Sequence, residues 1–80
     1  MTAEDARRAE ALFCSDLDMR ACPNGSVVRC TVTDTLAAVG EAECAARMAQ
    51  AYGDDPTYAA VRMRWALLSV GAAFSLATIP

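Results

Sequence analysis

The residue types that most often carry out chemistry are sparse in this chain. It contains no histidine, which removes the most frequent general base and metal ligand of proteins. Nucleophiles activated by histidine are therefore impossible. The acidic pairs Glu4-Asp5 and Asp54-Asp55 stand where helices are expected to begin, a position that suits their negative charge. The sequence thus predicts a protein that is not an enzyme and that holds no cofactor.

Four cysteines are the remaining candidates for chemistry. Cys14, Cys22 and Cys30 are spaced by eight residues, and Cys44 follows fourteen residues later. Zinc sites usually contain cysteine pairs two to four residues apart, and neither this spacing nor that of ferredoxins occurs. Cys14 and Cys44 are expected to be buried apolar residues, whereas Cys22, before Pro23, is expected to be exposed. Reduced structural cysteines are the main interpretation, with a redox or metal role as the alternative.

Length, composition and charge limit the class of protein. Eighty residues suffice for one domain with a thin core, which must use nearly every large apolar side chain. Hydrophobic residues make up 55% of the chain, and the abundance of alanine favours close helix packing, so an all-α fold is predicted. The net charge of −3 disfavours nonspecific binding to nucleic acid.

Periodicity predicts a small four-helix domain with a long central C-terminal helix. The expected helices span residues 2–19, 26–39, 41–52 and 56–77. The second segment also alternates as a strand does, with Val28 and Val32 on one side. A lone strand would have no pairing partner, and Gly40 stands where a helix would be capped, so a helix is preferred. Gly53 is expected to end the third helix.

The last predicted helix is the most apolar part of the chain. Asp55 is a strong N-cap candidate, and Pro56 occupies the first helical position, where proline is preferred. Two apolar stripes follow on nearly opposite sides. One consists of Tyr58, Val61, Trp65, Leu68, Ala72 and Leu76. The other consists of Met63, Leu67, Val70 and Phe74. Such a helix is buried on more than one side, either by the other helices or by a second chain.

This excess of apolar surface suggests a function in association. Leaving large apolar side chains in water would forfeit about 1.5–3 kcal/mol each and create an adhesive patch. The first hypothesis is a small, non-catalytic interaction or regulatory protein that forms a homodimer or binds a protein partner. The residues expected to mediate this contact are Met63, Trp65, Leu67, Val70 and Phe74.

The sequence gives little reason to expect a membrane protein. The N-terminal residues are charged and amphipathic, without the apolar core of a secretory signal. The uncharged run over residues 65–80 has 16 residues, fewer than the roughly 20 that span a bilayer. A cytoplasmic location is expected, without a membrane partner.

A DNA-binding function is the second hypothesis. Ala49 and Gly53, followed by a helix with two arginines, loosely match a helix-turn-helix. Residues 56–67, PTYAAVRMRWAL, look like a recognition helix of the kind found in region 4 of bacterial sigma factors. The candidate DNA contacts are Thr57, Arg62 and Arg64. So few exposed polar residues and an acidic net charge count against this interpretation.

Four stretches carry a resemblance to a family. RAEALF, CAARMA, YGDDP and RMRWAL, which occur in this order, resemble a group of short helical proteins from streptomycetes and related actinobacteria. In that group the segment matching residues 26–40 is a clear helix. The resemblance implies an actinobacterial cytosolic protein without an established activity. The chain departs from the group in Cys14, Cys22 and Cys30 and in its uncharged tail after Trp65.

Overall fold

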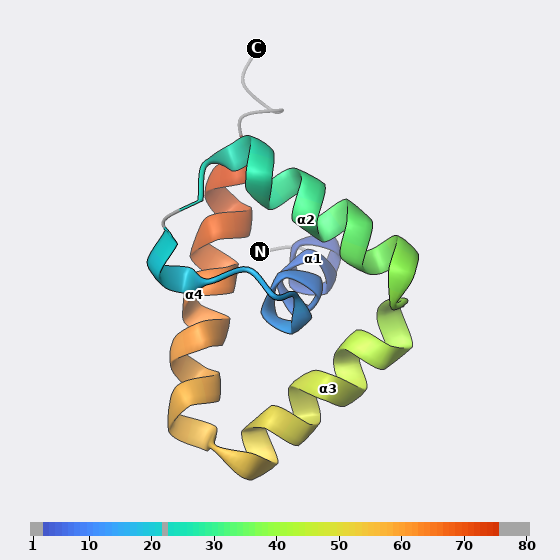
Figure 1. Cartoon of the computed structure of the whole chain (residues 1–80), viewed down its shortest axis with the longest axis vertical. Coiled ribbons are helices and arrows are strands. Elements are labelled where there is room, and N and C mark those ends of the chain that lie inside the picture. Colours follow the sequence, from blue (N-terminus) through green and yellow to red (C-terminus); the bar gives the residue numbers. More distant parts are fainter. Residues whose placement is uncertain (1–2, 22, 76–80) are drawn as a thin grey trace.

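The residues that the structure describes fold into four α-helices joined by short connections (Figure 1). The computed structural model describes residues 3–21 and 23–75. The helices are α1 (Ala3–Cys14), α2 (Gly25–Ala38), α3 (Glu41–Asp54) and α4 (Pro56–Ser75), and a 3-10 turn, η1 (Met19–Ala21), lies between the first two. No residue in these two ranges belongs to a β-strand, so the predicted all-α fold is confirmed.

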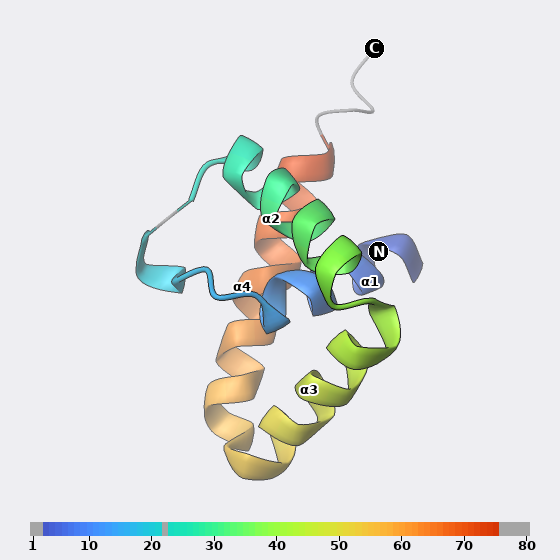
Figure 2. The ribbon, with the colours of Figure 1, turned by 45° about the vertical axis from the view of Figure 1, so that its right-hand side comes forward.

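Two helices, rather than one, form the centre of the molecule. Figure 1 shows α1 nearly end-on, inside a frame made by α2, α3 and α4, and the turned view in Figure 2 keeps the same neighbours. α1 and α4 each pack against all three other helices. The long C-terminal helix is therefore central, as predicted, and it shares that position with α1.

The core is made largely of small side chains. Its largest fully buried members are Leu12, Val70 and Cys44. Several alanines of α1 and α4 are at most 3% exposed, which lets the helix backbones approach one another closely. These alanines are Ala9, Ala11, Ala59, Ala66 and Ala73. A core of this kind depends on close backbone contact more than on the bulk of any one side chain.

α1 ends earlier than its periodicity predicts. The apolar pattern continues to residue 19, whereas the helix ends at Cys14. The hydroxyl of Ser15 donates to the carbonyl of Leu12 at 2.6 Å and accepts the N–H of Leu17 at 3.3 Å. Such local bonds give the backbone an alternative to another helical turn. The carbonyl groups left at this end are bound by Arg62, as described below.

α2 confirms the prediction of a helix over residues 26–39. The side-chain oxygen of Asn24 accepts a backbone N–H from the first turn at 3.0 Å, which caps the N-terminus. Val28 and Val32, one turn apart, are both 2% exposed and face the core, as a helix requires. Gly40 follows the C-terminus with φ of +90°, in the left-handed region that favours glycine.

The junction between α3 and α4 is only partly as predicted. α3 continues through Gly53 to Asp54, so the glycine does not end it. Asp55 makes the break with a φ of −150°. Its carboxylate accepts the N–H of Tyr58 at 3.1 Å, and α4 begins at Pro56. The predicted cap and first residue of the last helix are therefore confirmed.

Two glycines of this fold should respond oppositely to the same substitution. Gly40→Ala places a side chain at φ of +90° and should lower the free energy of unfolding by about 1 kcal/mol. Gly71→Ala fills open space within α4 and should raise it by up to about 1 kcal/mol, because alanine favours helix. Urea denaturation followed by circular dichroism measures both. A stabilised Gly40→Ala variant would contradict the assigned turn.

Candidate functional site

Arg62 lies in the interior and binds the C-terminal end of α1. It is 8% exposed, although arginine is normally a surface residue. Its Nε donates to the carbonyl of Phe13 at 2.7 Å, and its Nη1 donates to that of Leu17 at 3.1 Å. Its Nη2 donates to the carbonyls of Ser15 at 2.8 Å and Leu12 at 3.4 Å. One guanidinium group thus binds two carbonyls of the last turn of α1 and two of the residues that follow it.

The surroundings of Arg62 compensate for the burial of its charge. The C-terminus of a helix carries a partial negative charge, which a cation stabilises. Aromatic rings add to this, because the guanidinium carbon lies 5.0 Å from the centroid of Trp65 and 5.9 Å from that of Phe13. Within residues 3–21 and 23–75, the charge is balanced by these dipoles and rings rather than by a carboxylate.

The position of Arg62 corrects the predicted DNA contacts. A recognition residue must be free to reach a base or a phosphate, and Arg62 is enclosed by the backbone of α1. Thr57 and Arg64 are exposed on the same side of α4, so the predicted basic pair is reduced to one arginine. The structure does not give α4 the polar face that base recognition requires.

The residues predicted to mediate association face the other helices. Val70 is fully buried, and the remaining four are partly buried against the core, so the surface expected there is mostly used within the chain. Phe74, for example, lies under the guanidinium group of Arg8 at 4.1 Å. The other three are Met63, Trp65 and Leu67. Packing within the chain therefore leaves little of the predicted contact surface for a partner.

The opposite stripe of α4 is the one that faces solvent. Tyr58 is 50% exposed, Val61 56% and Leu68 67%. Trp65 and Ala72 complete the row, the first half-buried and the second exposed. We call these five residues the α4 stripe. Sequence periodicity finds both stripes and gives no sign of which is buried, because it treats Arg62 as a surface residue.

An open groove lies beside the C-terminal half of the α4 stripe. It has a volume of about 350 Å³ and separates α4 from the start of α2. Ser69 is the one side chain with a hydroxyl in its lining, which is otherwise apolar. Its lining residues are Pro23, Gly25, Val28, Leu68, Ser69, Ala72 and Ala73. Stripe and groove together form a continuous uncharged surface.

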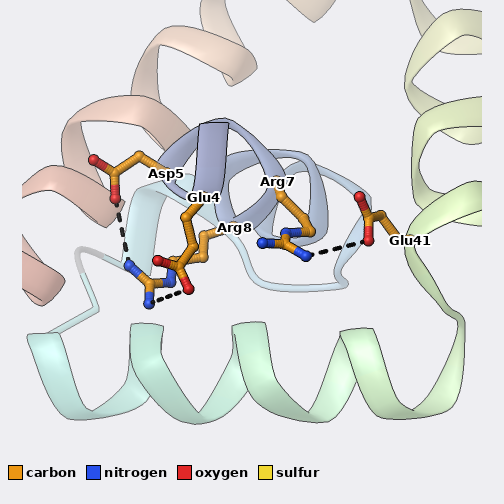
Figure 3. A network of polar contacts seen from close by, with 5 residues as sticks. All are labelled: Glu4, Asp5, Arg7, Arg8 and Glu41. Atoms are coloured by element: carbon orange, nitrogen blue, oxygen red, sulfur yellow. Dashed lines mark hydrogen bonds and ion pairs between the residues drawn. The ribbon is translucent and has the colours of Figure 1, made fainter. Parts of the chain in front are cut away.

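A second hollow is bordered by charged residues that neutralise one another. Arg8 lies between Glu4 and Asp5, and Arg7 points toward Glu41 of α3 (Figure 3). The N–O distance is 3.4 Å in each of these three ion pairs. The hollow, of about 500 Å³, is lined by four of these five residues, all except Asp5. Since both arginines already have carboxylate partners, this surface does not form a ready anion site. Exposed pairs of this kind add little stability.

The cysteines fall into two environments. Cys14 and Cys44 lie together between α1 and α3, and the Cys14 thiol donates to the Cys44 carbonyl at 2.9 Å. Burial, and then the neighbouring Cys44 thiol, raise the pKa of Cys14 to about 11, and burial raises the pKa of Cys44. Cys30 is exposed, and Cys22 lies outside the described residues. Reactive cysteines have lowered pKa values, so this pair fits a structural role.

Two further findings concern the described part of the chain. Across it, no helix is long and apolar enough to cross a membrane. Nor do three or more histidine, cysteine, aspartate or glutamate side chains come together there in a way that would hold a metal ion. The exposure of the α4 stripe and the apolar groove beside it make this surface the main candidate site.

Comparison with known proteins adds no relative. No protein-family model, curated protein or solved structure matches the chain. The resemblance to short helical proteins of actinobacteria stays a prediction.

Replacing Arg62 should destabilise the fold. Arg62→Ala leaves buried carbonyls without donors and should lower the free energy of unfolding by about 3 kcal/mol or more. Arg62→Lys keeps the charge, loses the planar fork and should also destabilise. Arg64→Ala, at an exposed neighbouring position, should change stability by less than about 0.5 kcal/mol. Equal urea midpoints for Arg62→Ala and Arg64→Ala would show that the buried cap is unimportant.

The thiols packed between α1 and α3 should make the fold sensitive to alkali. The pKa of Cys14 is about 11 in the folded state, against an ordinary 9.0, so the unfolded chain loses its proton first. The thiol's stabilising contribution is therefore complete below pH 9 and is lost as the pH rises toward 11. Urea unfolding at several pH values should show that the free energy of unfolding falls less with rising pH in Cys14→Ser than in the wild type.

The same environments should set the order in which the thiols react. Peptide mass spectrometry should find Cys30, which is exposed, alkylated before Cys14 and Cys44. The reverse order would contradict the packing of Cys14 and Cys44 between α1 and α3.

Proposed function

We propose that this chain is a small non-catalytic protein of the cytoplasm that acts by helix-mediated association, with the α4 stripe as its binding surface. The observation that carries the proposal is the exposure of Tyr58, Val61 and Leu68, at 50%, 56% and 67%, in one row on one helix. Isolated exposed apolar residues are ordinary, whereas a contiguous row indicates an interaction site.

The small size of the chain strengthens this argument. A domain of 80 residues has few large apolar side chains, and burying each one stabilises it by about 1.5–3 kcal/mol. Leaving three of them largely in water, next to a half-buried Trp65, gives up part of that stability. A partner that covers the stripe would recover it. A regulatory role follows if the partner's activity depends on this contact.

DNA binding is not proposed as a second function. The helix that would enter the groove offers Thr57 and Arg64 to solvent, and Arg62 is used inside the chain. The remaining face of α4 is apolar, and the net charge is −3. Both properties suit contact with protein better than contact with a phosphate backbone.

Photo-crosslinking in the native cell tests the proposal. A benzophenone side chain at position 68 should give discrete adducts, and the same group at Ala46, exposed on α3, should not. Adding Val61→Asp to the first variant should abolish its adducts, because a charge then interrupts the stripe. Equal adduct patterns from positions 68 and 46 would show that the stripe is not the binding surface.

A further inference from the structure

We infer that the partner of the α4 stripe is a second copy of the same chain, with the two α4 helices packed antiparallel about a twofold axis at Trp65. This inference rests on the proposed function and adds the identity of the partner. It follows from the spacing of the stripe, from the position of the groove relative to Tyr58, and from the area available.

The stripe has the spacing of a helix–helix seam. Its members, at positions 58, 61, 65, 68 and 72, are separated alternately by three and four residues. This is the repeat by which two α-helices pack side by side, with each side chain fitting between those of the partner. α4 packs against α1, α2 and α3 with its other face, whereas Tyr58, Val61 and Leu68 in this seam are 50%, 56% and 67% exposed.

The two ends of the stripe complement each other across Trp65. Tyr58 stands seven residues before Trp65, and Ala72, which borders the groove, stands seven residues after it. At 1.5 Å per residue, each end is about 10.5 Å from Trp65. A twofold axis at Trp65 therefore brings the Tyr58 ring of one copy to the groove of the other, and this happens twice. A surface that matches itself in this way is what a closed dimer needs.

The positions of Tyr58 and the groove around the axis of α4 also agree with this pairing. Ser69, in the lining of the groove, follows Tyr58 by eleven residues, which is about three helical turns. Both residues therefore lie on the same side of the stripe, and an antiparallel twofold operation preserves that side. The ring enters an apolar groove of about 350 Å³ whose serine hydroxyl can bond with the phenol group. A parallel pairing would instead place Tyr58 against Tyr58.

The apolar area that each copy can contribute limits the strength of the dimer. Tyr58, Val61 and Leu68 together present roughly 300 Å² of apolar side chain, within the range of functional patches on monomers. Trp65 and the groove add to this, toward the roughly 800 Å² that each partner contributes to a standard interface. The contact is therefore at the small end, and a micromolar dissociation constant is expected. Arg64 of each copy flanks the same edge, so added salt should strengthen the dimer by screening.

A charge-pair experiment tests both the partner and the direction. Val61 lies four residues before Trp65 and Leu68 three residues after it, so the antiparallel register brings Val61 to within about 1.5 Å, along the helix axis, of the level of Leu68 in the second copy. Sedimentation equilibrium on the purified chain should show a reversible dimer, and Val61→Lys or Leu68→Glu alone should weaken it at least tenfold. The double variant V61K/L68E forms two opposite-charge pairs and should recover most of that loss. The matched double variant V61E/L68E carries like charges and should stay monomeric. Circular dichroism checks that each variant remains folded.

The possible outcomes separate the inference from the function on which it rests. A purified wild-type chain that remains at 8.4 kDa at several hundred micromolar overturns the second copy as partner. Stripe-dependent adducts in cells would then still support association with another protein. A dimer that V61K/L68E fails to restore overturns the antiparallel register. A dimer unaffected by Leu68→Glu overturns the α4 stripe as its interface.

Discussion

The fold depends on one arginine side chain held in the carbonyl end of a helix. Arg62 donates to carbonyl groups at the end of α1 that lie up to 50 residues before it in the chain. This contact caps the carbonyl end of α1, joins it to α4, and fixes the rotation of α4 about its own axis. Because Arg62 faces inward, Ala59, Ala66 and Val70 face inward with it. The same rotation turns the α4 stripe outward, so the candidate binding surface is a consequence of the internal cap.

The sequence is sufficient where the determinants are local. The cap at Asp55, the start at Pro56 and the glycine after α2 all follow from the preferences of one or two residues. The choice of helix over strand for α2 also holds, because four helices leave a strand no partner. The cap, the helix start and the glycine need no knowledge of the rest of the molecule, whereas the choice for α2 needs only the number of other strands.

Non-local determinants explain what the sequence does not reveal. Periodicity cannot show that α1 ends at Cys14, because its end depends on a guanidinium group from a distant segment. A hydrophobicity pattern also places every arginine on the surface, so it gives no sign that the stripe with Met63 and Phe74 is the one packed against the core. The groove beside Leu68 needs α2 as its other wall, so no single helix contains the signal for it.

The position of Trp65 has a practical consequence. It is the only tryptophan of the chain, its ring centroid lies 5.0 Å from the Arg62 guanidinium carbon, and it is a half-buried member of the α4 stripe. Emission from this one indole therefore reports on two events. Release of the cationic group on unfolding changes its polar surroundings, and a neighbouring molecule changes its access to water. The protein carries its own optical probe at the point where internal packing and external contact meet, and no label is needed to follow either.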